Sequence, residues 1–167
     1  MGDRHLEQDV RRAREFEAFV AGAGGRLLHT ATLLTGESAA ANPRARRLLA
    51  LALAHTYASW HRLRGEDPYD RTRRHLAVRF ADGAWHQYGG RGCARPHPDS
   101  PLFPLTPRER LVLVLRWYEG VGEDQVGALL GMPAERVHAV CERATTTLLR
   151  PPPAPVRPPA GAKVAPS

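Results

Sequence analysis

The sequence is poor in cysteine, lysine and aromatic residues, and it has no long apolar run. Its 167 residues include two cysteines and 7% aromatic residues, against 43% hydrophobic residues in total. Cys93 and Cys141 have no paired spacing, which argues against both a disulfide framework and a zinc site. No stretch approaches the roughly 20 apolar residues that a membrane span needs. The charged N-terminus also lacks the apolar core of a signal peptide, so we expect a cytoplasmic protein.

The motifs of common enzyme active sites are missing as well. The chain has no glycine-rich phosphate loop, no nucleophile elbow and no His–Glu pair at metalloprotease spacing. His86, Cys93 and His97 match no common zinc pattern, and no fourth ligand stands near them in the sequence. We therefore predict that the chain is not an enzyme and binds no metal or cofactor.

The net charge of +7 is unevenly distributed along the chain. Residues 1–88 hold fourteen arginines against ten acidic residues, whereas residues 105–150 hold six of each. Most DNA-binding modules carry a basic excess, because phosphate contacts dominate their affinity. The neutral C-terminal half therefore argues against strong autonomous DNA binding.

Hydrophobic periodicity predicts helices throughout residues 1–88, and no segment alternates as a strand does. We expect one helix before a glycine-rich break at residues 22–25 and a second that ends at Gly36. A third should follow the cap and first-turn pair Asn42–Pro43, and a fourth should run from near Pro68 to Gly89. Two tryptophans at helical spacing among apolar residues are expected in the core, namely Trp60 and Trp117.

Residues 89–104 are rich in glycine and proline and indicate a linker. After it, Thr106 and Glu109 form a capping box around a helix that starts with Pro107. Two further helices should end near residue 150, and the proline-rich residues 151–167 should form a disordered tail. The linker carries no packing signal, so the sequence does not predict how the two halves are placed.

The segment from Glu123 to Ala144 has the pattern of a helix-turn-helix. Gly131 favours a helix stop with a left-handed backbone, and Pro133 stands where a second helix would begin. Gly127 has no side chain to keep the two helices apart. The apolar positions of the two facing sides are Val126, Leu130, Val137 and Val140. The spacing alone leaves an ordinary αα-hairpin open as the alternative.

The stretches "FEAFV", "ALAHTYASW", "DPYDRTRR" and "LTPRERLVLVLRWYEGVGEDQVGALLGMPAERV" together resemble the extracytoplasmic-function sigma factors of the sigma-70 family. The resemblance implies a divergent or degenerate member with an all-α fold of two small domains. A four-helix, region 2-like domain would occupy residues 1–88. A three-helix, region 4-like domain with the helix-turn-helix would occupy residues 105–150, after the linker 89–104 and before the tail 151–167.

The resemblance also implies partners and site residues. Core RNA polymerase would be contacted by Arg47, Leu48, Leu49 and Ala50. The promoter −10 element would be contacted by Arg71, Arg73, Arg74, Arg79 and Trp85. The −35 element would be read by Ala134, Glu135, Arg136, His138, Ala139 and Arg143. An arginine there could reach guanine O6 and N7 or hold a phosphate.

Several positions depart from the family pattern. Arg46, Arg47 and Ala50 stand where the family has an acidic pair and a glutamine, and Glu135 and Glu142 would face phosphate. Two alternatives to a working sigma factor therefore stay open. One is a degenerate sigma-like regulator that acts through protein partners, such as an anti-sigma factor, without initiating transcription. The other is a small independent DNA-binding protein, which the neutral residues 105–150 disfavour.

Overall fold

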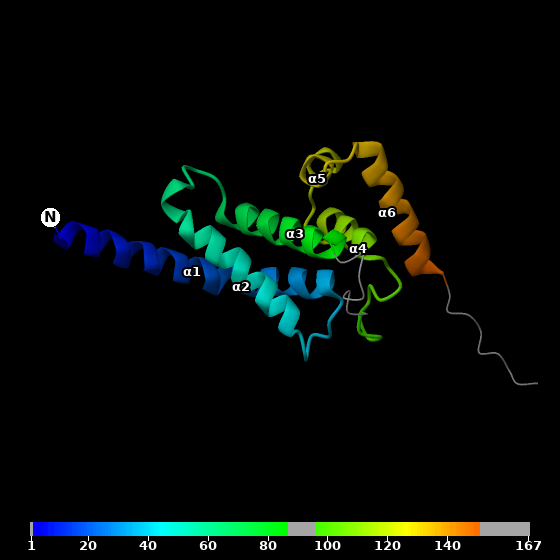
Figure 1. Ribbon diagram of the computed structural model, residues 1–167, viewed down its shortest axis with the longest axis horizontal. Coiled ribbons are helices and arrows are strands. Elements are labelled where there is room, and N and C mark those ends of the chain that lie inside the picture. The colour runs from blue at the N-terminus through cyan, green and yellow to red at the C-terminus, as the bar shows by residue number, and fades with distance from the viewer. Residues whose placement is uncertain (1, 87–95, 151–167) are drawn as a thin grey trace, which may run out of the picture.

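The computed structural model describes residues 2–86 and 96–150, and this part of the chain is helical without a named strand. The predicted all-α class is therefore confirmed. Figure 1 shows the arrangement of the helices, and two short segments, η1 (Trp60–Arg62, 3-10) and η3 (Val114–Tyr118, π), accompany them. The main helices are α1 (Gly2–Thr35), α2 (Pro43–Ala58), α3 (Pro68–His86), α4 (Pro107–Leu113), α5 (Glu123–Leu130) and α6 (Ala134–Leu149). No described helix is long and apolar enough to cross a membrane.

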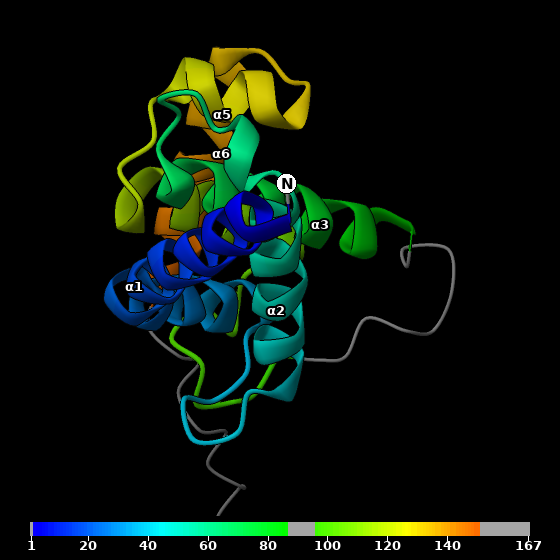
Figure 2. The ribbon, with the colours of Figure 1, turned by 90° about the vertical axis from the view of Figure 1, so that its left-hand side faces the viewer.

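The first lobe, α1 to α3, has three main helices rather than the four expected. The predicted break is wrong because α1 runs without interruption through Gly22, Gly24 and Gly25. A glycine in a helix costs about 1 kcal/mol relative to alanine. That cost is offset where α1 packs against α2 and α3, with Leu27 and Leu34 fully buried (Figures 1 and 2). Tertiary packing here overrides local propensity.

The start of α2 is capped by a residue that the sequence pattern did not indicate. Asn42 occupies the N-cap position, but its side chain makes no capping bond and donates instead to Thr32 Oγ1, at 3.0 Å. The Glu37 carboxylate accepts hydrogen bonds from the backbone N–H groups of Arg44, at 3.1 Å, and Ala45, at 2.7 Å. Burial by itself would raise the pKa of Glu37, but these hydrogen bonds outweigh it and the pKa is lowered.

The two lobes pack against each other in one continuous core. The second lobe comprises α4, η3, α5 and α6, and its α4 and α5 both contact α3. The Glu119 carboxylate, at the end of η3, is fully buried at this junction and accepts hydrogen bonds from Thr30 and from Tyr69, the latter at 2.9 and 3.0 Å. Arg26 and Arg73 approach the same carboxylate at 3.7 and 3.8 Å. All four partners come from the first lobe, so this cluster fixes the placement that the sequence did not predict.

A second polar contact joins the lobes at the end of α1. Arg110, only 2% exposed, donates from Nε to the carbonyl oxygen of Leu34, at 3.1 Å. A cation is favoured there because the C-terminal end of a helix carries partial negative charge. The end of the predicted linker also packs at this place, since His97 donates its backbone N–H to Gly36 O, at 2.7 Å, and Leu102 is buried.

The two tryptophans expected in the core have different surroundings. Trp60 lies against Phe16 and Phe19, with ring centroids 5.3 and 5.6 Å away, but it is only half-buried and is not one of the core residues. Trp117 is 70% exposed, so its assignment to the core is wrong. It follows the buried Leu115 by two residues, which is about half a turn of η3 and therefore on the opposite face.

Substitution by alanine at two glycines near the end of α1 should change the free energy of unfolding in opposite directions. A Cβ at Gly25 would meet no atom within 4 Å, so Gly25→Ala should raise the free energy of unfolding by about 0.5–1 kcal/mol. Gly36 has φ +67°, and its Cβ would lie 2.8 Å from Pro96 Cβ. Gly36→Ala should lower the free energy of unfolding by at least about 1 kcal/mol. Urea unfolding of both variants checks the pair, and equal effects would contradict it.

The Tyr69–Glu119 hydrogen bond should be visible in stability and in its pH dependence. Burial, followed by the hydrogen bond to Glu119, raises the pKa of Tyr69 well above its usual value. The neutral phenol therefore stabilises the fold below about pH 10, and this contribution falls at higher pH, where the unfolded chain releases the proton first. At pH 8 the free energy of unfolding of Tyr69→Phe should be about 1–3 kcal/mol lower than that of the wild type. Urea unfolding measures this difference in free energy, which should be smaller at about pH 10.5 than at pH 8.

Candidate nucleic-acid interface

The second lobe contains the predicted helix-turn-helix as α5, a tight turn and α6. Gly131 ends α5 with φ 66°, in the left-handed region that favours glycine. The Met132 backbone N–H then donates to Gly127 O, at 2.9 Å. Gly127 is required for this close approach, because a Cβ there would lie 2.5 Å from the Met132 carbonyl oxygen. Val126 and Val137 are fully buried where the two helices meet.

Helix α6 has one buried face and one outward face. Val137, Val140, Cys141 and Ala144 are buried. Burial also raises the pKa of the Cys141 thiol, as expected for a packed rather than a reactive cysteine. All six residues predicted for the −35 element lie away from this buried face: Ala134 is half-buried, and Glu135, Arg136, His138, Ala139 and Arg143 are exposed. The fold thus brings them together on one surface, and their contact with DNA stays a prediction.

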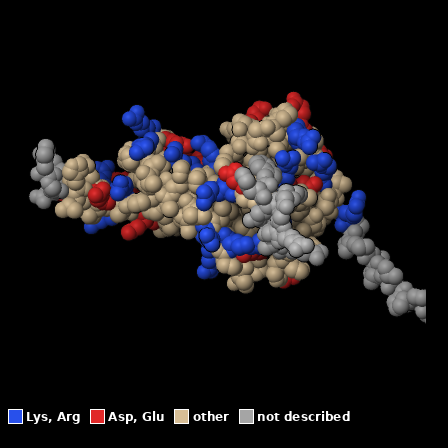
Figure 3. Space-filling model, viewed as in Figure 1, with Lys and Arg blue, Asp and Glu red and all other residues tan. Residues whose placement is uncertain are grey.

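The charges on this outer surface are mixed. Figure 3 shows basic and acidic atoms interspersed over α5 and α6 rather than in a continuous basic patch. His138 Nδ1 lies 3.3 Å from Glu123 Oε1, and Arg116 lies 3.2 Å from the same oxygen. Glu123, at the first position of α5, therefore positions a side chain of α6. The sequence pattern does not indicate this role, because only the crossing of the two helices brings the residues together.

The arginines predicted for the −10 element lie on α3 but do not form one free cationic surface. Arg71 and Arg74 both bind the Glu66 carboxylate, at 2.8 and 3.0 Å. Arg73 is paired with Asp70, at 3.0 Å, and its other guanidinium nitrogen faces Glu119 of the second lobe.

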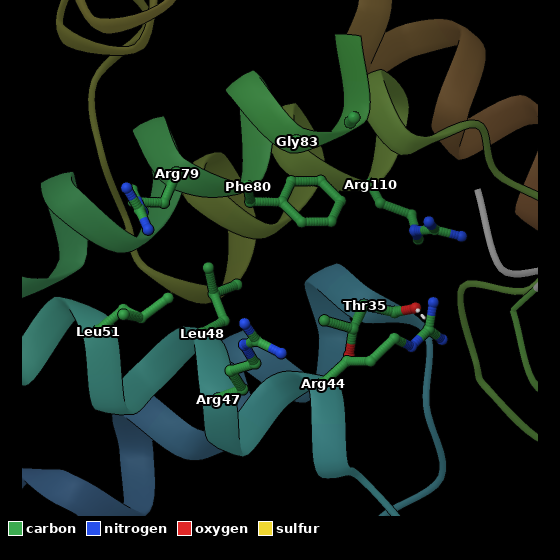
Figure 4. Close-up of a pocket in the computed structure, with 10 residues that line it drawn as sticks. Thr35, Arg44, Arg47, Leu48, Leu51, Arg79, Phe80, Gly83 and Arg110 are labelled. Atoms are coloured by element: carbon green, nitrogen blue, oxygen red, sulfur yellow. Dashed lines mark hydrogen bonds between the residues drawn. The ribbon is translucent and has the colours of Figure 1, made fainter. Parts of the chain in front are cut away.

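The other two −10 candidates are Arg79 and Trp85. Arg79 is exposed further along α3, where it faces α2 (Figure 4). The side chain of Trp85 lies outside the described part of the structure.

The four residues predicted to contact polymerase divide between surface and core. Arg47 and Ala50 are exposed on α2, and Leu48 is half-buried. Leu49 is only 9% exposed and belongs to the hydrophobic core, so its side chain supports α2 instead of presenting itself to a partner.

Comparison with known proteins agrees with this geometry in the second lobe. The family model described as Sigma-70, region 4 matches residues 102–148, which span α4, η3, α5 and nearly all of α6. No curated protein matches the chain, and no solved structure matches it. The C-terminal part of the chain is therefore similar to region 4 of sigma-70 proteins over these residues. The match begins three residues before the predicted boundary at Leu105, consistent with the burial of Leu102.

The close approach at Gly127 gives a direct test of the helix-turn-helix packing. Gly127→Ala should lower the free energy of unfolding by about 1–3 kcal/mol, because its Cβ would meet a backbone oxygen. Gly122→Ser is the matched control at the N-cap of the same helix. Its Cβ would meet only Gln125 atoms at 3.7 Å or more, and serine is a preferred N-cap residue. Thermal unfolding of both variants checks this, and a tolerated Gly127→Ala would contradict it.

Proposed function

We propose that this chain is a sigma-factor-like transcription initiation protein, which binds core RNA polymerase and promoter DNA. In this proposal α6 reads a −35-type element and α3 of the first lobe acts at the −10 element. The observation that carries it is the outward face of α6, which lies inside the part that is similar to sigma-70 region 4 and holds Arg136 and Arg143.

The spacing on α6 suits reading of the major groove. Arg136 and Arg143 are seven residues apart, which is about 10.5 Å along one face of a helix. Arginine pairs with guanine O6 and N7, and a glutamate such as Glu135 can accept from cytosine N4. The acidic residue is thus compatible with base reading, although it would repel a phosphate.

The balanced charge of the second lobe favours DNA binding within a larger complex. Its six arginines are matched by six acidic residues, and one of each, Arg110 and Glu119, is buried at the lobe junction. Phosphate contacts supply most nonspecific affinity, so a neutral domain binds DNA weakly alone. Core polymerase would supply the missing affinity.

Simultaneous contact with both promoter elements would require the lobes to separate. The −35 and −10 elements lie about 25 base pairs apart, or ~85 Å along B-form DNA. In the described conformation α5 of the second lobe lies directly against α3 of the first. The Glu119 cluster would therefore open when the protein engages a promoter, and Arg73 would be released from Glu119 in the same step.

A second candidate function is a degenerate sigma-like regulator that acts through a protein partner. It is favoured by Arg46 and Arg47, both exposed on α2 where the resembling family carries acidic residues. A charge reversal at a polar interface can cost several kcal/mol through like-charge contact. An anti-sigma factor is one partner of this kind.

Binding to core RNA polymerase from the source organism distinguishes these two functions. Tight binding of the wild-type chain in fluorescence anisotropy is expected for a working sigma factor. The comparison variant Arg46→Glu/Arg47→Asp/Ala50→Gln carries the family-like surface. If the wild type fails to bind while this variant binds, the polymerase surface has changed and the regulator is the better description.

The role of α6 can be tested in the holoenzyme on a promoter selected from a random library. Arg136→Ala and Arg143→Ala should each weaken open-complex formation by about tenfold, since a bidentate arginine–guanine contact contributes about 1–3 kcal/mol. Relaxed preference at one base would indicate base reading, and uniform weakening would indicate a phosphate contact. Arg14→Ala, exposed on α1, is the control. Unchanged activity in both α6 variants would contradict the proposal.

A further inference from the structure

A groove of about 240 Å³ lies between α2 and α3, and we refer to it as the α2–α3 groove (Figure 4). Helix α2 forms one wall and α3 the other, while the end of α1 and α4 contribute at one end. Its lining residues are Thr35, Arg44, Arg47, Leu48, Leu51, Arg79, Phe80, Gly83, Ala84 and Arg110.

The larger apolar side chains that line the groove are only partly buried. Leu51 is 41% exposed although it lies on the side of α2 that faces α3. Leu48, three residues earlier on the same helical face, and Phe80 on the opposite wall are half-buried. Exposed apolar surface with a polar rim is typical of protein interaction sites.

The rim is strongly basic. Four of the lining residues are arginines, and none is acidic. Arg44 is held by Glu37 and Arg110 by Leu34 O, so these two are fixed in the wall. Arg47 and Arg79 are exposed on opposite walls, and Figure 4 shows both beside the gap between the helices. An acidic occupant is therefore electrostatically complementary to the groove.

The volume and shape select the kind of occupant. Sites that enclose a whole small-molecule ligand measure about 300–1,000 Å³, which is more than this groove offers. One or two aliphatic side chains would fill it. An elongated apolar groove between two helices is the usual receptor for an amphipathic helix, with anchors at positions i, i+3, i+4 and i+7. A single nucleic-acid strand stacks successive bases on aromatic side chains, and Phe80 is the one aromatic residue in this lining, which is a poorer match.

We propose that the α2–α3 groove binds an acidic amphipathic helix of a partner protein. Aliphatic side chains of that helix enter between Leu48, Leu51 and Phe80, and its carboxylates pair with Arg47 and Arg79. This proposal rests on the proposed function in one respect, namely that α2 contacts a protein partner. It adds that the contacting part of the partner is an acidic amphipathic helix. DNA reading by α6 is independent of it.

A pair of fluorescent peptides of about 18 residues, or five helical turns, provides the probe. The acidic peptide carries leucine at positions i, i+4 and i+7 on one face and glutamate at the flanking positions. The second peptide has lysine in place of each glutamate. The full-length chain should bind the acidic peptide at least about tenfold more tightly in anisotropy, because like charges at an interface cost several kcal/mol. Equal affinity for the two peptides, or no binding of the acidic one, would overturn the proposal.

Variants at Gly83 test the location. A Cβ at Gly83 would meet no atom within 4 Å, so a larger side chain can be added there without a clash in the fold. Gly83→Leu should narrow the groove and weaken acidic-peptide binding at least about tenfold, because the added side chain occupies space that the peptide needs. Gly83→Ala is the matched control and should bind like the wild type. Unchanged binding by Gly83→Leu would place the peptide elsewhere and overturn the proposal.

Charge variants separate a local effect from a general one. Arg47→Glu/Arg79→Glu should abolish the preference for the acidic peptide. Arg14→Glu/Arg62→Glu changes the net charge equally at exposed positions outside the groove, and should weaken binding less than about twofold at physiological salt. Equal losses in the two double variants would overturn the proposal, and circular dichroism verifies that each variant is folded.

A competition assay with a nucleic acid tests the alternative occupant. An oligothymidylate of about 16 nucleotides should not displace the acidic peptide. Displacement that disappears in Gly83→Leu would identify the groove as a nucleic-acid site and overturn the proposal. These assays contain no polymerase and no promoter. If the acidic peptide does not bind but the chain still binds polymerase, only the proposal for the α2–α3 groove is refuted.

Discussion

The arrangement of this protein depends on one buried carboxylate. Glu119 belongs to the second lobe, yet its hydrogen-bond donors Thr30 and Tyr69 and its neighbouring cations Arg26 and Arg73 all belong to the first. A carboxylate is removed from water at a cost of several kcal/mol unless it is paired and hydrogen-bonded. Glu119 can therefore be buried only while the lobes are docked. When they separate, water solvates the same carboxylate, which offsets part of the hydrogen bonding that is lost.

Docking of the lobes through Glu119 affects the accessibility of the two candidate DNA surfaces differently. The outer face of α6 is exposed in the docked form. On α3, by contrast, Arg73 is held partly by Glu119, and α5 lies against the helix. The docked conformation therefore leaves the −35 candidate accessible and engages part of the −10 candidate. The α2–α3 groove lies within the first lobe apart from Arg110, so a partner can approach it without separating α3 from α5.

Features set by neighbouring residues were predictable from the sequence. The capping box of Thr106 and Glu109 is present, and Gly131 takes the left-handed conformation expected of it. These depend on backbone sterics and hydrogen bonds within a few residues. The failed predictions involve distant contacts. Local propensity indicated a break near Gly25, but the packing of α1 maintains one helix. Asn42 and Pro43 occupy the predicted N-cap and first turn of α2, but the chain reversal before α2 brings Glu37, and not the Asn42 side chain, to the free N–H groups.

The sequence by itself determined the helical class, the turn of the helix-turn-helix and which side of α6 faces outward, because all three follow from helical periodicity and local backbone geometry. Only the tertiary structure decided where the lobes sit, that Glu119 is buried among first-lobe residues, and that α2 and α3 leave a basic-rimmed groove. Those features join residues dozens of positions apart. Their energies come from desolvation, charge pairing and shape, which exist only once the helices have packed.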